Sequence, residues 1–167
     1  HLPFTRYLAE QKIIFGMSHL SHGYKLISSL FFLNSTFYLP FINFFSFHFT
    51  LIFFLIFFNY FLLKEIISKS TAEIIKYLYL FSFIFFNLSF NRIAEYGTDK
   101  AGQLLIVILT IKFFQIICFD RNLDNNKNIY NKIIILIPLI AFCITLKTYF
   151  LSYILLGFLI FFLNENV

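Results

Sequence analysis

Apolar residues form five long runs along the chain, and short polar segments separate them. The runs are residues 47–63, 74–90, 103–119, 133–146 and 148–163. The first three have 17 residues each, which is about 25 Å of helix at 1.5 Å per residue. With their flanking residues they match a hydrocarbon core of about 30 Å. The pattern therefore predicts an all-α fold, a polytopic membrane helix bundle with about five spanning helices.

The fourth run is short for a span. It reaches a suitable length if residues 129–132 join its helix and the Lys132 ammonium extends to the membrane interface. Between the fourth and fifth runs, the chain has room only for a tight turn around Lys147. We expect the last two helices to be joined there.

Residues 26–40 are ambiguous, because Lys25 and the helix-breaking Pro40 limit them to about 22 Å of helix. A polar stripe recurs at a seven-residue interval on this otherwise apolar segment; its members are Ser28, Ser29, Ser35 and Thr36. Such a stripe favours one or two helices that lie in the membrane interface. The alternative is a sixth spanning helix with a polar packing stripe.

These elements predict three regions. Residues 1–46 form an external loop with interfacial helices, residues 47–163 form the transmembrane bundle, and residues 164–167 are a truncated tail. The chain begins with His1 rather than Met, and it ends just as an apolar run stops. We therefore expect an internal piece of a longer protein.

Loop charges predict the orientation. The loops at 64–73 and 120–132, with Lys76, carry six basic residues, whereas the short loops on the other side carry three: Arg92, Lys100 and Lys147. An excess of Lys and Arg marks the cytoplasmic side, so the first two loops are predicted to be cytoplasmic. If residues 26–40 crossed the membrane, the count would become nine against three. Charge alone favours that alternative, and length and the polar stripe oppose it.

Composition excludes several classes of protein. The chain is 60% hydrophobic and 13% charged, far from the typical values for soluble domains, which excludes a soluble enzyme and a disordered chain. The net charge is +5, but the basic residues do not cluster, so no nucleic-acid partner is expected. Cys118 and Cys143 lie inside apolar runs and are interpreted as small buried side chains rather than disulfide or metal ligands.

Two polar segments carry most of the candidate chemistry. The first contains Arg6, Glu10, His19 and His22, and the second contains Arg92, Glu95, Asp99 and Lys100. The spacing of His19 and His22 places both imidazoles on one helical face, but two histidines without an assignable carboxylate make a poor metal site. Interfacial hydrogen bonding is the favoured role for them. We predict no metal and no cofactor, since nothing supports a divalent metal ion.

Glu95 and Asp99 are four residues apart, which would bring them together on a helix, although Gly97 favours a turn. The alternative is a solvated loop in which they pair with Arg92 and Lys100.

Two further lysines occupy unusual positions. Lys112 lies in the middle of the third run, where a charge is costly, so it should face a cavity or the protein interior and meet a lipid-linked phosphate or a carboxylate. Lys147 either holds a phosphate at the non-cytoplasmic surface or, as favoured, anchors the helix ends.

The opening segment resembles part of the bacterial multi-span membrane proteins of the GT-C glycosyltransferase type, which are relatives of the dolichyl-phosphate-mannose-type and lipid-linked-sugar transferases. The matching residues are His1-Leu2-Pro3, Gly16, His19, Leu20 and Ser28-Ser29. Residues 92–99 are similar to a later external loop of that family. The resemblance covers most of the chain and implies an interfacial helix pair after a first span. It also implies that the acidic general base lies upstream of His1.

This resemblance implies transfer of a sugar from a polyprenyl-phosphate donor to an acceptor, at the non-cytoplasmic face of a bacterial inner membrane. Such a reaction needs a carboxylate and cations near the phosphate. We assign catalysis to Asp99 and Glu95, and substrate binding to the other polar groups: His19, His22, Arg6, Glu10, Arg92 and Lys147. The expected partners are membrane lipids and a polyprenyl-phosphate-linked sugar. The alternative is a non-enzymatic transporter or accessory subunit with Lys112 as a relay group.

Overall fold

The computed structural model describes residues 2–12, 19, 28–89, 99–119 and 126–155. Its helices are α1 (Leu2–Glu10), α2 (Ser29–Thr36), α3 (His48–Ile67), α4 (Glu73–Leu88), α5 (Asp99–Cys118) and α6 (Asn126–Leu146). Two 3-10 helices, η3 (Phe44–Phe47) and η6 (Thr148–Tyr153), precede α3 and follow α6. Within these residues the only β feature is an isolated bridge between Leu39 and Asn43. The predicted all-α fold is confirmed for this part of the chain.

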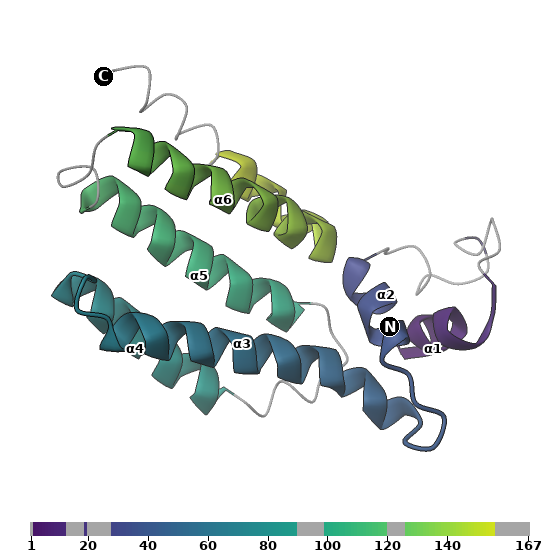
Figure 1. The fold of residues 1–167 in the computed structure, drawn as a ribbon. Coiled ribbons are helices and arrows are strands. Elements are labelled where there is room, and N and C mark those ends of the chain that lie inside the picture. The colour runs from purple at the N-terminus through teal and green to yellow at the C-terminus, as the bar shows by residue number, and fades with distance from the viewer. Residues whose placement is uncertain (1, 13–18, 20–27, 90–98, 120–125, 156–167) are drawn as a thin grey trace.

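The four long helices α3 to α6 form a bundle, and the short helices α1 and α2 lie at one of its ends (Figure 1). Helix α5 packs against α3, α4 and α6, and is therefore the central element. The buried side chains follow this arrangement: Phe58 and Leu62 of α3, Ile75 and Tyr79 of α4, and Leu104 of α5 belong to one core cluster. Residues of the first and third apolar runs thus pack on each other.

Two helices among the described residues are long and apolar enough to cross a membrane. They are Phe45–Ile67, which joins η3 to α3, and Lys100–Cys118. Helix α4 has 16 residues, and the apolar part of α6 is limited to Ile134–Leu146. The prediction of about five spanning helices is therefore not confirmed, and its last run lies partly outside the described residues.

The fourth run does extend toward its N-terminus. Helix α6 begins at Asn126 and includes residues 129–132, as predicted. It ends at Leu146, after which Lys147 is extended and η6 begins at once. The tight turn around Lys147 is confirmed.

The ambiguous segment 26–40 contains only a short helix in its described part. Helix α2 has eight residues, about 12 Å, which is too short to cross a hydrocarbon core. The polar stripe has two uses: the hydroxyls of Ser35 and Thr36 donate to carbonyls of their own helix, whereas Ser28 and Ser29 contact the end of α6. Residues 26 and 27 of the segment lie outside the described part.

The two cysteines differ. Cys143 is buried, as predicted, whereas Cys118 is exposed, so the prediction for it was wrong. Cys118 is the last residue of α5, at the end of the helix rather than in its packed middle. An apolar neighbourhood in the sequence does not by itself bury a side chain at a helix end.

A glycine sets the contact between α5 and η6. The Phe150 ring of η6 is buried against Gly102 in the first turns of α5. A Cβ at position 102 would lie 2.9 Å from Cζ of this ring and closer still to Cε2. Only glycine allows this close approach.

Candidate functional site

Arg6 and Glu10 form an exposed ion pair on α1, and Tyr38 joins it. The guanidinium Nε lies 3.1 Å from Oε1 of Glu10, and the Tyr38 hydroxyl donates to the same oxygen at 3.0 Å. These hydrogen bonds, from Arg6 first and then from Tyr38, lower the pKa of Glu10. The same contact raises the pKa of Tyr38, because the phenol donates its proton to a carboxylate. The sequence placed Arg6 and Glu10 in one segment but gave no sign of Tyr38.

Aromatic contacts attach this cluster to the rest of the N-terminal region. The Tyr38 ring stacks on Phe47 with centroids 5.4 Å apart, and Phe4 packs edge-on against Phe31 of α2 at 5.5 Å. Helix α1, helix α2 and η3 therefore form one packed unit. We call residues 2–12 and 28–47 the N-terminal unit.

Several predicted site residues lie outside the described residues. They are His22, Arg92 and Glu95, so neither the pairing of the two histidines nor that of the two acids is tested. His19 is described and is exposed. Asp99 is the first residue of α5, and its side chain is outside the description. No group of three His, Cys, Asp or Glu residues able to hold a metal ion occurs in the part of the chain that the structure describes.

The N-terminal unit and the start of α5 share one end of the bundle (Figure 1). The Ser28 hydroxyl donates to the carbonyl of Leu146, the last residue of α6, and Ser29 and Thr145 hydroxyls lie 3.1 Å apart. On the other side of the same turn, Phe150 packs on Gly102 of α5. Two predicted groups far apart in the sequence, Arg6 with Glu10 and the helix that Asp99 begins, are thereby brought to one end.

Lys147 lies at this shared end. Its backbone N–H donates to the Cys143 carbonyl at 3.2 Å, and its carbonyl accepts from Phe150 N–H at 3.0 Å. The residue is extended and half-buried between α6 and η6. Its backbone therefore forms the turn, and the choice between anchoring and phosphate binding for its side chain stays a prediction.

A second polar site, which the sequence revealed only in part, lies toward the other end of the bundle. Lys112 of α5 forms an ion pair with Glu65 of α3, with 2.9 Å between Nζ and Oε1, and both side chains are largely buried, 23% and 15% exposed. The expectation that Lys112 meets a carboxylate or a phosphate is thus met by a carboxylate of the same chain. Lys112 is also farther from the middle of its helix than the third run suggested, because α5 begins at Asp99, before the start of that run.

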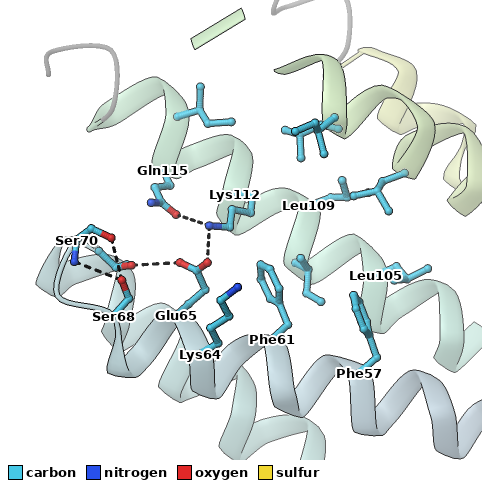
Figure 2. Close-up of a pocket in the computed structure, with 16 residues that line it drawn as sticks. Phe57, Phe61, Lys64, Glu65, Ser68, Ser70, Leu105, Leu109, Lys112 and Gln115 are labelled. Atoms are coloured by element: carbon cyan, nitrogen blue, oxygen red, sulfur yellow. Dashed lines mark hydrogen bonds and ion pairs between the residues drawn. The ribbon is translucent and has the colours of Figure 1, made fainter. Parts of the chain in front are cut away.

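Neighbouring side chains make further contacts with both members of this pair (Figure 2). The Lys112 ammonium donates to Gln115 at 3.2 Å and lies 5.4 Å from the centroid of the Phe61 ring, a cation–π geometry. The Thr71 hydroxyl donates to the second Glu65 oxygen, Oε2, at 3.1 Å. Each charge is therefore compensated and hydrogen-bonded, as a largely buried ion pair requires.

Glu65 was missed because the first apolar run appeared to end before Lys64. A signal was present nonetheless. Leu55, Phe58, Leu62 and Glu65 follow a spacing of three, four and three residues, and the first three are buried on one face of α3. An acid that continues a buried heptad stripe predicts a buried partner of opposite charge.

The pair borders a cavity of about 500 Å³ between α3, α5 and α6. Its walls are mostly apolar and include Phe57, Leu105 and Leu139, and its polar residues gather near Glu65 and Lys112. This combination of an apolar chamber and a few converging polar groups is typical of ligand sites.

Comparisons with known proteins identify no relative. No protein-family model, no curated protein and no solved structure matches the chain. The function is therefore inferred from the residues, from their placement and from the resemblance of the opening segment to the GT-C type.

Proposed function

We propose that the chain is part of a GT-C-type membrane glycosyltransferase that moves a sugar from a polyprenyl-phosphate donor to an acceptor at the non-cytoplasmic face of a bacterial inner membrane. The observation that carries the proposal is the shared end of the bundle, where the N-terminal unit contacts the end of α6, and η6, which follows α6, packs on the first turns of α5. A transferase of this type requires polar groups from distant segments to meet where the bilayer ends. The eight-residue length of α2 supports the interfacial position that this requires.

Membrane insertion is supported by the outer surface of α3 and α4. Phe53, Ile56 and Tyr60 of α3, and Phe81 and Leu88 of α4, are exposed large apolar or aromatic side chains. Only 39% of the apolar window in Phe45–Ile67 is buried within the molecule, whereas a core helix of a soluble protein is mostly buried. Lipid is the environment in which such a surface is stable. If residues 1–46 are external, the first of the five proposed spans brings the 64–73 loop to the cytoplasmic side.

The N-terminal unit supplies suitable chemistry for a phosphate and a sugar. Arg6 is 60% exposed on its side chain, and its bond to Glu10 is made by Nε; an exposed guanidinium suits a bidentate grip on phosphate. Glu10 and Tyr38 hold this guanidinium in place, and His19 and His22 are assigned to sugar hydroxyls. Asp99 and Glu95 are assigned to orienting the reacting hydroxyls, beside the general base that the resemblance implies upstream of His1.

The test is Asp99→Asn in the full-length protein. We expect sugar transfer in isolated membranes to fall by about 100-fold or more, the size that misplacement of the reacting groups can cost, with unchanged membrane abundance. The matched control is Glu73→Gln, because Glu73 is likewise an acidic first residue of a helix, α4, at the opposite end of the bundle. Transfer that survives Asp99→Asn at normal abundance contradicts the proposal.

The largely buried Glu65–Lys112 pair favours a second candidate, a non-enzymatic membrane protein that uses Lys112 as a proton or ion relay. The two candidates differ in proteoliposomes. A relay protein conducts protons or cations, and the double substitution Glu65→Gln with Lys112→Gln stops the flux. The transferase shows no flux that depends on this pair.

A further inference from the structure

The cavity of about 500 Å³ extends from the middle of α3 and α5 toward the end of the bundle opposite the N-terminal unit, and none of its lining residues belongs to that unit. Figure 2 shows Lys64 and Glu65 extending from α3 toward the side on which Lys112 lies. The polar corner of the cavity contains these three residues together with Ser68, Ser70, Thr71 and Gln115. The rest of the lining is apolar. The cavity therefore has one polar corner and an apolar body, as a lipid has a polar headgroup and apolar chains.

The charges at the polar corner do not balance. Both oxygens of Glu65 are engaged, one with Lys112 and the other with the Thr71 hydroxyl. Lys64 is exposed, and within the described residues its ammonium has no ion-pair partner. Two ammonium groups therefore face one carboxylate, which leaves one excess positive charge that suits a singly charged anion.

Hydroxyl groups add donors beside Lys64. The Ser68 and Ser70 hydroxyls lie 2.8 Å apart and share one hydrogen bond. Because two hydroxyls carry two protons and this bond uses one, the other proton remains available to an anion oxygen. An ammonium with an adjacent hydroxyl donor is suitable for a phosphate oxygen.

The surroundings point to an anion that carries an acyl chain. Phe57, Leu105 and Leu139 line the cavity away from the polar corner, and its volume is within the range of small-molecule sites. A shallow groove runs from Lys64 and Ser68 to the exposed apolar side chains Tyr60, Leu63 and Ile67. We propose that the cavity binds an anionic membrane phospholipid, with its phosphodiester at Lys64 and Ser68 and an acyl chain along Phe57 and Leu139.

The test measures lipid binding to the purified full-length protein by native mass spectrometry. The probes are phosphatidylglycerol, which has a net negative charge, phosphatidylcholine, which is neutral overall, and inorganic phosphate. We expect phosphatidylglycerol to bind about tenfold more tightly than phosphatidylcholine, because both lipids present a phosphodiester but the choline cation of phosphatidylcholine is repelled by the excess positive charge at Lys64. Lys64→Gln should remove this preference, whereas the control Lys69→Gln, an exposed lysine that follows α3 and lies outside the lining, should retain it.

A second variant tests the apolar part. Leu139→Trp fills the cavity without changing its charge, and it should weaken the binding of both lipids. The proposal is overturned if phosphatidylcholine binds equally well, or if Lys69→Gln acts like Lys64→Gln, which would indicate diffuse surface charge. It is also overturned if inorganic phosphate alone displaces the lipid, which would indicate a free-phosphate site. Sugar transfer is a separate readout, so either proposal can fail without the other.

Discussion

Glu10 connects α1 to the segment after α2 through one carboxylate oxygen, which receives both Arg6 and Tyr38. Its pKa is lowered in the folded protein, so this contact stabilises the N-terminal unit at neutral pH. The stabilisation is lost as the pH falls through the lowered pKa. The contribution is small because the groups are exposed.

We predict that Arg6→Gln raises the pKa of Glu10 toward its ordinary value, and that Tyr38→Phe raises it by less, since the hydrogen bond from Arg6 is the larger cause. Carboxyl carbon NMR of the protein in detergent micelles, followed against pH, measures this. An unchanged titration in both variants would contradict the cluster as described.

In the Glu65–Lys112 pair, removal of one member should lower stability more than removal of both. Removal of one member leaves a largely buried charge without compensation, whereas removal of both leaves none. We predict that Glu65→Gln lowers the free energy of unfolding in detergent by about 3 kcal/mol, and that the double variant with Lys112→Met recovers most of this loss. Equal and additive losses in denaturant unfolding would show that the two residues do not interact.

At the scale of elements, the apolar runs located the helices but not their ends. Residues 47–63 were expected and α3 runs over His48–Ile67; residues 103–119 were expected and α5 runs over Asp99–Cys118. In both cases charged residues, Lys64 with Glu65 and Asp99 with Lys100, continue the helix. Hydropathy falls at such residues, whereas backbone hydrogen bonding and helix propensity do not.

The same reason explains what the sequence revealed of the sites. The resemblance and the residue types pointed to Arg6, Glu10 and Asp99 as candidate site residues, because a charged side chain is recognised from the sequence without knowledge of its neighbours in the fold. The Glu65–Lys112 pair and the Tyr38 contact join residues 47 and 28 positions apart, and only the packing of α3 on α5 and of α1 on α2 brings them together. Asn59 and Asn87, which exchange amide hydrogen bonds of 3.0 and 2.8 Å between α3 and α4, are another such pair.

The contact of η6 with α5 gives an element-scale prediction. Gly102→Ala should displace the Phe150 ring, because the added methyl overlaps it, and should cost about 1–3 kcal/mol in stability. Adding Phe150→Leu should recover part of the loss by making room for the methyl. Thermal unfolding of the single and double variants in detergent checks this, and no recovery in the double variant would contradict the ring contact as the cause.

At the scale of the whole molecule, the four long helices separate two polar regions. The N-terminal unit and the start of α5 share one end, and the Glu65–Lys112 pair with its cavity lies toward the other (Figure 1). If lipid covers the exposed apolar faces of α3 and α4, these regions meet opposite aqueous compartments. The transferase proposal requires the first region to be non-cytoplasmic, and the excess of basic residues around Lys64 predicts that the second is cytoplasmic.

Accessibility of single cysteines in intact cells tests this arrangement most directly. Gln11→Cys, Lys100→Cys and Lys69→Cys would each be made in the full-length protein after Cys118 and Cys143 are replaced by serine, and treated with a membrane-impermeant maleimide. The account predicts that the reagent modifies positions 11 and 100 from outside, and position 69 only after the membrane is opened. Modification of position 100 but not of position 11 in intact cells would place the N-terminal unit and the start of α5 in different compartments and would contradict the account.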